Sequence, residues 1–356
     1  MPSKSNNKYA IYKTKPLRLC DLARKKMELI TKIHIPNSNQ PIDYNSRIIS
    51  FGSCFAENMG EKLEYFKIQT TTNPFGILFH PLAIEKIITS ALSEKQFTEK
   101  DIFFHNERWH CFDVHSDASH EDKEQFLKQL NAALLATKKV LLVATHCIIT
   151  LGTAWVYRFK KTNQVVANCH KVPQNEFEKE LLSIDEMETS LENCIALLRK
   201  VNPNITFIFT ISPVRHLKDG FVENQRSKAH LISALQSVLA KRNTSLLWGG
   251  VGGGDYFPSF EIMMDELRDY RFYVQDMVHP SQVAIDYIWQ RFVETWISKE
   301  VFPIMKEVEN IQRDLNHRPF HLKSKAHVAF LSQLEGKIHQ LQKKYKHIHF
   351  NKTPKL

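Results

Sequence analysis

Short apolar runs alternate with amphipathic helical stretches along most of this chain, and this alternation limits the possible folds more than any other feature. The apolar runs span 47–51, 67–71, 140–144, 205–211 and 245–248. Apolar residues recur at helical spacing over 56–66, 84–92, 122–137, 187–198, 231–239 and 283–296. Buried runs separated by such helices indicate an α/β fold with a parallel sheet covered on both faces. Right-handed crossovers then bring the loops after the strands to one edge, where ligands of these sheets bind.

Composition and charge indicate a globular chain with a separate basic N-terminal segment. Of the 356 residues, 43% are hydrophobic and 11% aromatic, which is ample for a packed core. The net charge is +10, but residues 1–26 hold eight Lys and Arg against one acid, Asp21, so the rest of the chain carries only about +3. No nucleic-acid partner is therefore expected.

Three segments are predicted. Residues 1–26 lack the apolar region of a secretory signal, and we expect a disordered extension there. An α/β domain should span 27–300. Residues 301–356 should form a helical appendage, because 303–345 carries an apolar stripe among Lys and Gln that is typical of a packed helix face.

The cysteines and the longest apolar run exclude several classes of protein. Six cysteines are scattered without a Cys-x-x-Cys pair, which argues against zinc and a disulfide framework and favours a reducing cytoplasm. The apolar run from Val140 to Tyr157 is interrupted by polar residues and Gly152, so a buried strand with its loop is expected in place of a membrane span. No metal, cofactor or membrane partner is predicted, and the oligomeric state is left open.

A candidate nucleophile lies in the pentapeptide Gly52-Ser53-Cys54-Phe55-Ala56, where the first strand turns into a helix. The unpaired N–H groups and the macrodipole at a helix start lower a thiol's pKa and can bind an oxyanion. Ser53 and Cys54 are both candidates. The structural alternative is a buried cysteine in a turn of small residues.

The residues for a base and its orienting acid follow near the last helix of the sheet domain. Asp276 and His279 lie three positions apart before a helical pattern that starts near Pro280 and Ser281. In a turn, the carboxylate of such a pair can accept a hydrogen bond from Nδ1–H and leave Nε2 free to take a proton.

Other polar residues near the expected edge have two interpretations each. Arg215 and His216 follow the run at 205–211 and fit either an anionic or sugar-like substrate or, for Arg215, a structural ion pair. The polar residues at the start of the next helix, 223–228, fit capping and solvated positions better than ligands. The glycine-rich stretch at 249–254 lacks a Gly-Lys-Ser/Thr ending, so a loop over the cleft is expected there and not a phosphate loop.

These motifs together resemble the GSCFA family, which is named for the pentapeptide at 52–56, and more broadly the SGNH/GDSL hydrolase superfamily. The resemblance covers 27–300 and is carried by the pentapeptide, by the Asp276/His279 motif, and by the stretches at 73–76, 150–155, 212–216 and 256–279. It implies a flavodoxin-like three-layer α/β/α sandwich and ester or acyl chemistry.

Two departures from the superfamily pattern affect the implied site. Aligning Gly-Asp-Ser with Gly52-Ser53-Cys54 puts Cys54 at the nucleophile position. The superfamily's Gly-x-Asn falls on Gly152 to Ala154, so the amide that helps to bind the oxyanion is missing. The backbone N–H groups of Cys54 and Gly76 and the side chain of Asn73 are the substitutes considered. Gly152 is also expected among the residues that bind the oxyanion or the substrate.

The sequence therefore predicts an acyl-ester hydrolase or acyltransferase in which His279, oriented by Asp276, deprotonates Cys54. The substrate class is a small-molecule or glycan acyl ester. The alternative function is a catalytically weak or inactive binding protein for glycans or acyl groups, which the missing oxyanion amide favours.

Overall fold

The protein is described from a computed structural model covering residues 30–93, 95–244, 255–317, 321 and 324–350. Its strands are β1 Arg47–Gly52, β2 Gln69–Thr72, β3 Phe103–His105, β4 Arg108–His110, β5 His146–Leu151, β6 Trp155–Phe159, β7 Gln164–Val166, β8 Phe177–Leu181 and β9 Thr206–Ile211. Its helices are α2 Cys54–Tyr65, α3 Pro81–Leu92, α4 Lys123–Leu141, α5 Ile184–Val201, α6 Phe221–Thr244, α7 Ser259–Glu261, α8 Gln282–Trp296, α9 Phe302–Asn316 and α10 Lys325–Lys344.

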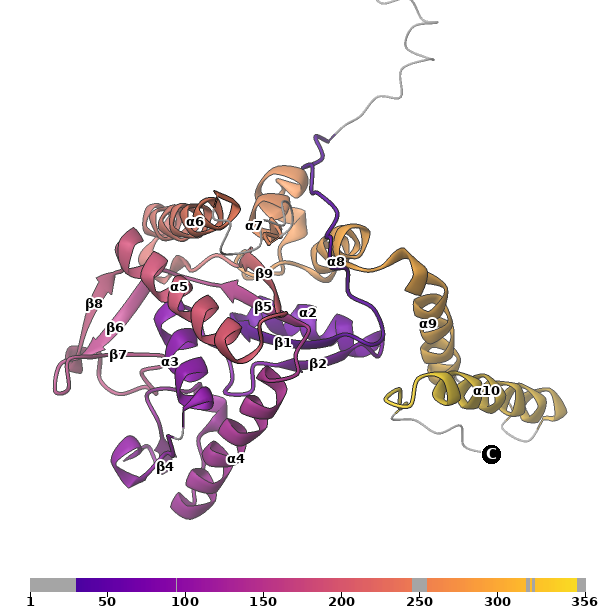
Figure 1. Ribbon diagram of the computed structural model, residues 1–356, viewed down its shortest axis with the longest axis horizontal. Coiled ribbons are helices and arrows are strands. Elements are labelled where there is room, and N and C mark those ends of the chain that lie inside the picture. Colours follow the sequence, from indigo (N-terminus) through magenta and orange to yellow (C-terminus); the bar gives the residue numbers. More distant parts are fainter. Residues whose placement is uncertain (1–29, 94, 245–254, 318–320, 322–323, 351–356) are drawn as a thin grey trace, which may run out of the picture.

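The central sheet is parallel, as the apolar runs predict. Its order is β2-β1-β5-β9, and Ile48 pairs with His146 of β5 while His146 pairs with Thr206 of β9. An isolated parallel bridge between Phe209 and Tyr256 extends the sheet past β9. Because β1 lies inside the sheet, the turn that follows it opens at the middle of the carboxyl edge (Figure 1).

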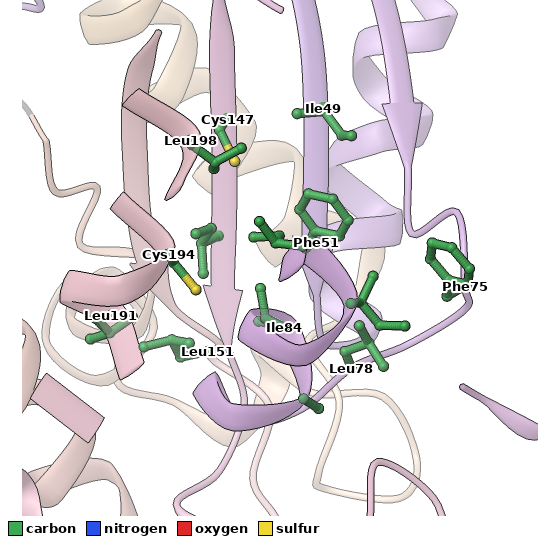
Figure 2. Packing of buried hydrophobic residues seen from close by; sticks show 14 of the residues in the cluster. Ile49, Phe51, Phe75, Leu78, Ile84, Cys147, Leu151, Leu191, Cys194 and Leu198 are labelled. Carbon is green, nitrogen blue, oxygen red and sulfur yellow. The ribbon is translucent and has the colours of Figure 1, made fainter. Parts of the chain in front are cut away.

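Helices cover both faces of this sheet. Alternate strand residues such as Phe51, Cys147 and Leu151 pack with α3, α4, α5 and α6 in one cluster of buried side chains, part of which Figure 2 shows. Ile48, Ile148 and Ile208 point to the other face and pack with α2 and α8. Successive strand side chains point to opposite faces, so a strand that is apolar at every position needs helices on both sides.

The helices begin where the sequence supplies caps. The Asp122 side chain accepts the Gln125 N–H at the start of α4, and the Ser281 side chain accepts the Ala284 N–H at the start of α8. Ser183 and Glu186 form a capping box before α5. These bonds satisfy N–H groups that a helix cannot satisfy internally, which fixes where each helix starts.

Two small antiparallel sheets were not predicted. β3 pairs with β4, and β6 lies between β7 and β8 in a three-stranded sheet. The strands of the second sheet contain charged residues at half-buried positions, so they lack a continuous apolar run. This second sheet matters for function because its residues line the pocket described below.

One strand was predicted in the wrong place. Residues 140–144 form the last part of α4 and the turn that follows it. The strand β5 begins only at His146. The helix extends because Val140 and Leu141 continue its apolar spacing. The predicted strand at 245–248, the glycine-rich stretch at 249–254 and the basic segment at 1–26 lie outside the described residues.

The predicted helical appendage is present as α9 and α10, which lie at one end of the molecule (Figure 1). Val308 and Ile311 of α9 and Leu334 of α10 are buried in the same cluster as α2 and α8. The Tyr44 ring lies 5.1 Å from that of Tyr345. The appendage therefore packs on the α/β part of the same chain.

Candidate functional site

The turn after β1 exposes one of the two candidate nucleophiles and buries the other. Ser53 is fully buried, its N–H donates to Thr150 O at 3.1 Å, and its Oγ has no hydrogen-bond partner among the described residues. Cys54 is the first residue of α2, is half-buried and lines a pocket. Only the Cys54 side chain is therefore presented to a ligand in that pocket.

A close approach of two strands shapes this turn. Gly52 has φ +145°, a conformation that favours glycine, and a Cβ at this position would collide with the Thr150 carbonyl of β5. The Gly52 N–H donates to Asn73 Oδ1 at 2.9 Å. These contacts fix the backbone just before Cys54, so the direction of the thiol is set by the sheet and not by a free loop.

The Asp276/His279 turn has the geometry that its spacing predicts. His279 Nδ1 lies 2.7 Å from Asp276 Oδ2, and Asp276 Oδ1 accepts the N–H groups of Val278 and His279. These three hydrogen bonds to the carboxylate lower the pKa of Asp276 to about 2, first through the His279 N–H. Asp276 is therefore ionised at neutral pH and holds the imidazole with Nε2 directed away from it.

Cys54 and His279 line the same pocket, which has a volume of 870 Å³. Its walls come from the loops after β1, β5 and β9, from the 276–279 turn and from the β7-β6-β8 sheet. The Arg215 N–H donates to Val278 O at 3.2 Å and ties the loop after β9 to that turn. The sequence thus predicted two motifs, far apart in the chain, that the fold brings into one cavity.

The electrostatics of the Cys54 thiol differ from the sequence prediction. Burial, followed by the nearby Glu57 carboxylate, raises the thiol's pKa. The Lys228 ammonium and the N–H groups of Phe55 and Cys54 act in the opposite direction and are weaker. The helix start alone does not produce a thiolate here, because burial of the charged form outweighs it.

Lys228 is buried at the site, which the sequence did not predict. The sequence placed 223–228 among capping and solvated residues, but Lys228 on α6 is 1% exposed. Its Nζ donates to Gly152 O and to Ser212 O, each at 2.7 Å, and it forms no ion pair with any described residue. Burial lowers its pKa from 10.5 to about 7, while the Cys54 thiolate form raises it.

The lysine therefore lies close to Cys54 and bridges the residues that directly follow β5 and β9. Gly152 packs against Ser53, since a Cβ on Gly152 would lie 3.2 Å from the Ser53 Cβ. The carbonyl that Lys228 bonds is thus next to the turn that carries Cys54. Burying a cation without an opposite charge is costly, and groups with strongly shifted pKa values cluster at functional sites.

The predicted oxyanion donors have other partners. The Gly76 N–H donates to Asn73 O at 2.8 Å, and the Gly152 N–H donates to Phe79 O at 2.7 Å. Asn73 Oδ1 accepts the Gly52 N–H, and its amide faces Glu57. These groups hold the turns around Cys54 together. Of the predicted donors, the Cys54 N–H remains at the pocket, next to the Phe55 N–H at the start of α2.

Arg215 and His216 both lie in the pocket, as predicted. The Arg215 guanidinium stacks 4.1 Å from the Tyr273 ring centroid and 5.1 Å from that of Tyr270. It makes no ion pair with a described residue, so the structural ion pair considered for it is not found. The His216 ring packs edge-on against Phe79, and burial lowers its pKa to about 3, so the ring is neutral.

Sequence reasoning missed Lys228 and the β6–β8 wall of the pocket. A buried lysine gives no local signal, because its burial depends on strands far away in the chain. In the part of the chain that the structure describes, no group of His, Cys, Asp and Glu could hold a metal ion. Within the same residues, every helix is too short or too polar to cross a membrane.

The fold and the site define an α/β protein with a pocket at the carboxyl edge of a parallel sheet. The profile of the GSCFA family matches residues 47–292, and that of the GSCFA domain protein C-terminal domain matches residues 308–353. The chain belongs to the GSCFA family, as its pentapeptide suggested. No curated protein matches the chain.

Proposed function

We propose that this protein is an acyl-ester hydrolase or acyltransferase with Cys54 as nucleophile and His279 as base. The observation that carries the proposal is that Cys54 and His279 line one pocket, and that Asp276 holds the His279 imidazole. Simple binding requires neither a cysteine at a helix start nor an imidazole held by a carboxylate.

The proposed reaction proceeds through a thioester. Cys54 Sγ attacks the acyl carbonyl carbon while His279 Nε2 accepts the thiol proton. The intermediate collapses, the bond to the alcohol breaks, and the alcohol takes that proton from His279. Water then loses a proton to the same imidazole and attacks the thioester carbonyl. The C–S bond breaks, Cys54 takes the proton back from His279, and the acid leaves; an acceptor hydroxyl in place of water gives transfer.

Two features around Cys54 support the formation of negative charge on its sulfur. The N–H groups of Cys54 and Phe55 face the sulfur at the start of α2 and are available to an oxyanion beside it. The buried ammonium of Lys228 lies close enough to oppose the desolvation of the thiolate. We assign Lys228 a positioning role, because it acts on the substrate only through Cys54.

We further propose that the chain shares the flavodoxin-like fold of the SGNH/GDSL hydrolase superfamily. The strand order β2-β1-β5-β9 with helices on both faces supports this, as does a nucleophile that directly follows β1. The proposed substrates remain small-molecule or glycan acyl esters.

The proposal is tested by comparing Cys54→Ala, Ser53→Ala and His279→Ala with the unmodified protein, using a p-nitrophenyl acyl ester. Cys54→Ala and His279→Ala should each lose about 10²-fold or more in kcat/KM, whereas Ser53→Ala should keep most of it. Ser53→Ala serves as the matched control because it changes the adjacent residue. Full activity in both Cys54→Ala and Ser53→Ala would exclude catalysis at this turn.

A second candidate function is a binding protein that does not turn its ligand over. One observation favours this function. The N–H groups of Gly76 and Gly152 and the side chain of Asn73 bond to other protein groups, so they do not offer hydrogen bonds to an oxyanion in the pocket. An acyl-fluoride probe discriminates between the two functions. A binder has no reason to activate Cys54, so it would leave Cys54 unlabelled while retaining the probe non-covalently.

A further inference from the structure

The pocket extends well beyond the space that a short acyl group needs. It is 870 Å³ in volume, which is the size of sites that hold whole cofactor-sized ligands. From Cys54 it continues along the β7-β6-β8 sheet, where Trp155, Tyr157 and Phe177 form an apolar wall. A substrate that fills this space has a long body attached to its reacting carbonyl.

Cations are concentrated at this pocket. Lys171, Lys179, Lys218 and Arg215 line it, and Asp219 is the acid that lines it with them. Lys179 pairs with Asp219 and lies over the Trp155 ring, 5.0 Å from its centroid. Asp219 is therefore paired with Lys179. No acid that lines the pocket balances the charges of Lys171, Lys218 and Arg215.

The three remaining cations form no ion pair with any described residue. Lys218 Nζ lies over the Tyr157 ring at 5.9 Å, and Arg215 stacks on Tyr273. The Nη1 atom of Arg215 is buried and has no hydrogen-bond acceptor in the described part of the chain. The guanidinium therefore has no carboxylate partner among the described residues, and an anion is the acceptor that would suit its charge.

We propose that the substrate is an anionic acyl ester or thioester, whose phosphate or carboxylate group binds Arg215 and Lys218 while its apolar body lies along the β7-β6-β8 sheet. This rests on the proposed function for the reacting carbonyl at Cys54. The anion itself is a separate requirement, since Arg215 and Lys218 take no part in the bond changes. Arg215 presents a planar fork that suits a phosphate or carboxylate, and Lys218 adds a point charge.

The test compares acetyl-phosphopantetheine with acetyl-pantetheine, two thioesters that differ only in the phosphate group. Mono-p-nitrophenyl succinate and p-nitrophenyl butyrate form a second pair, with a carboxylate on the acyl side. We expect at least about a tenfold preference in kcat/KM for the anionic member of one pair, and this preference should shrink as salt is raised. The pair that shows it identifies which anion is bound and on which side of the carbonyl it lies.

Variants and a binding measurement keep this test separate from the proposed function. Arg215→Met and Lys218→Met should each reduce the preference towards one, whereas the exposed Lys139→Met on α4 should preserve it. Calorimetric titration with phosphopantetheine, pantetheine and succinate gives the same comparison without turnover. Equal binding of the charged and neutral ligands, or equal rates within both pairs, would overturn the proposal. Selective binding of an anion without turnover would support the anion site and count against the catalytic function.

Discussion

The buried ammonium of Lys228 leads to a prediction that can be worked out in advance. Lys228→Met removes the charge and keeps an unbranched side chain of similar length. The variant also leaves Gly152 O and Ser212 O without their donor, at a cost of about 1–3 kcal/mol each. That cost does not depend on pH, so the titration of the lysine can be separated from it.

The pH-dependent part follows from the pKa. Burial lowers the pKa of Lys228 from 10.5 to about 7, which at about 1.4 kcal/mol per pH unit corresponds to roughly 5 kcal/mol for burying the charged form. Between these two values the unfolded chain binds more protons than the folded one, so the lysine's contribution to stability improves as pH rises. From about pH 6 to about pH 9, the stability of the native protein relative to Lys228→Met should increase by roughly 2–3 kcal/mol.

Urea unfolding at several pH values, followed by far-UV circular dichroism, measures this difference. Both proteins should keep Cys54, because the pKa of about 7 includes the effect of the neighbouring thiolate on Lys228. Lys139→Met, on an exposed face of α4, is the matched control and should show no such slope. If the difference in free energy of unfolding between the native protein and Lys228→Met stays constant with pH, the lowered pKa of the buried Lys228 is refuted.

Three further substitutions test the turns around the site. Ser53→Ala should leave the free energy of unfolding unchanged or raise it by up to about 1 kcal/mol, because its Oγ is buried without a partner and caps no N–H; a clear loss of stability would contradict this. Asp276→Asn should lower kcat/KM about 10²-fold with an unchanged melting temperature, because His279 loses the carboxylate that orients it; full activity would remove Asp276 from the mechanism. Gly52→Ala should cost more than about 2 kcal/mol in urea unfolding, because its φ is +145° and a Cβ meets the Thr150 carbonyl; a wild-type transition would contradict the close approach of β1 and β5.

The sheet and the Asp276–His279 hydrogen bond were predictable because their signals are local. Alternation of apolar runs and helical spacing requires no knowledge of tertiary contacts, and it located β1, β2 and β9 and the helices between them. Asp276 and His279 lie within one turn, so their spacing determines their hydrogen bond. The strand predicted at 140–144 was wrong because these apolar residues end a helix and form its turn, where Leu142 and Val143 are exposed, and composition alone does not distinguish this from a buried strand.

The parts that could not be predicted depend on contacts between distant segments. Lys228 is buried because the chain after β5 and after β9 closes over it, and the β5 contact, at Gly152, lies 76 positions away in the sequence. The N–H groups of Gly76 and Gly152 looked available in the sequence, but neighbouring turns use them. The β6–β8 wall has no continuous apolar run to reveal it. The cytoplasmic location, the boundaries of the three segments and the acyl chemistry stay predictions.

The central claim is that Cys54 carries the acyl group, and a trapped intermediate tests it most directly. The protein is mixed with p-nitrophenyl acetate, quenched in acid within the first turnover, digested, and the peptides are analysed by tandem mass spectrometry. The account predicts one acetyl group on Cys54, which is absent in His279→Ala. An acetyl group on Ser53, or labelling of Cys54 that is unaffected by His279→Ala, would contradict it.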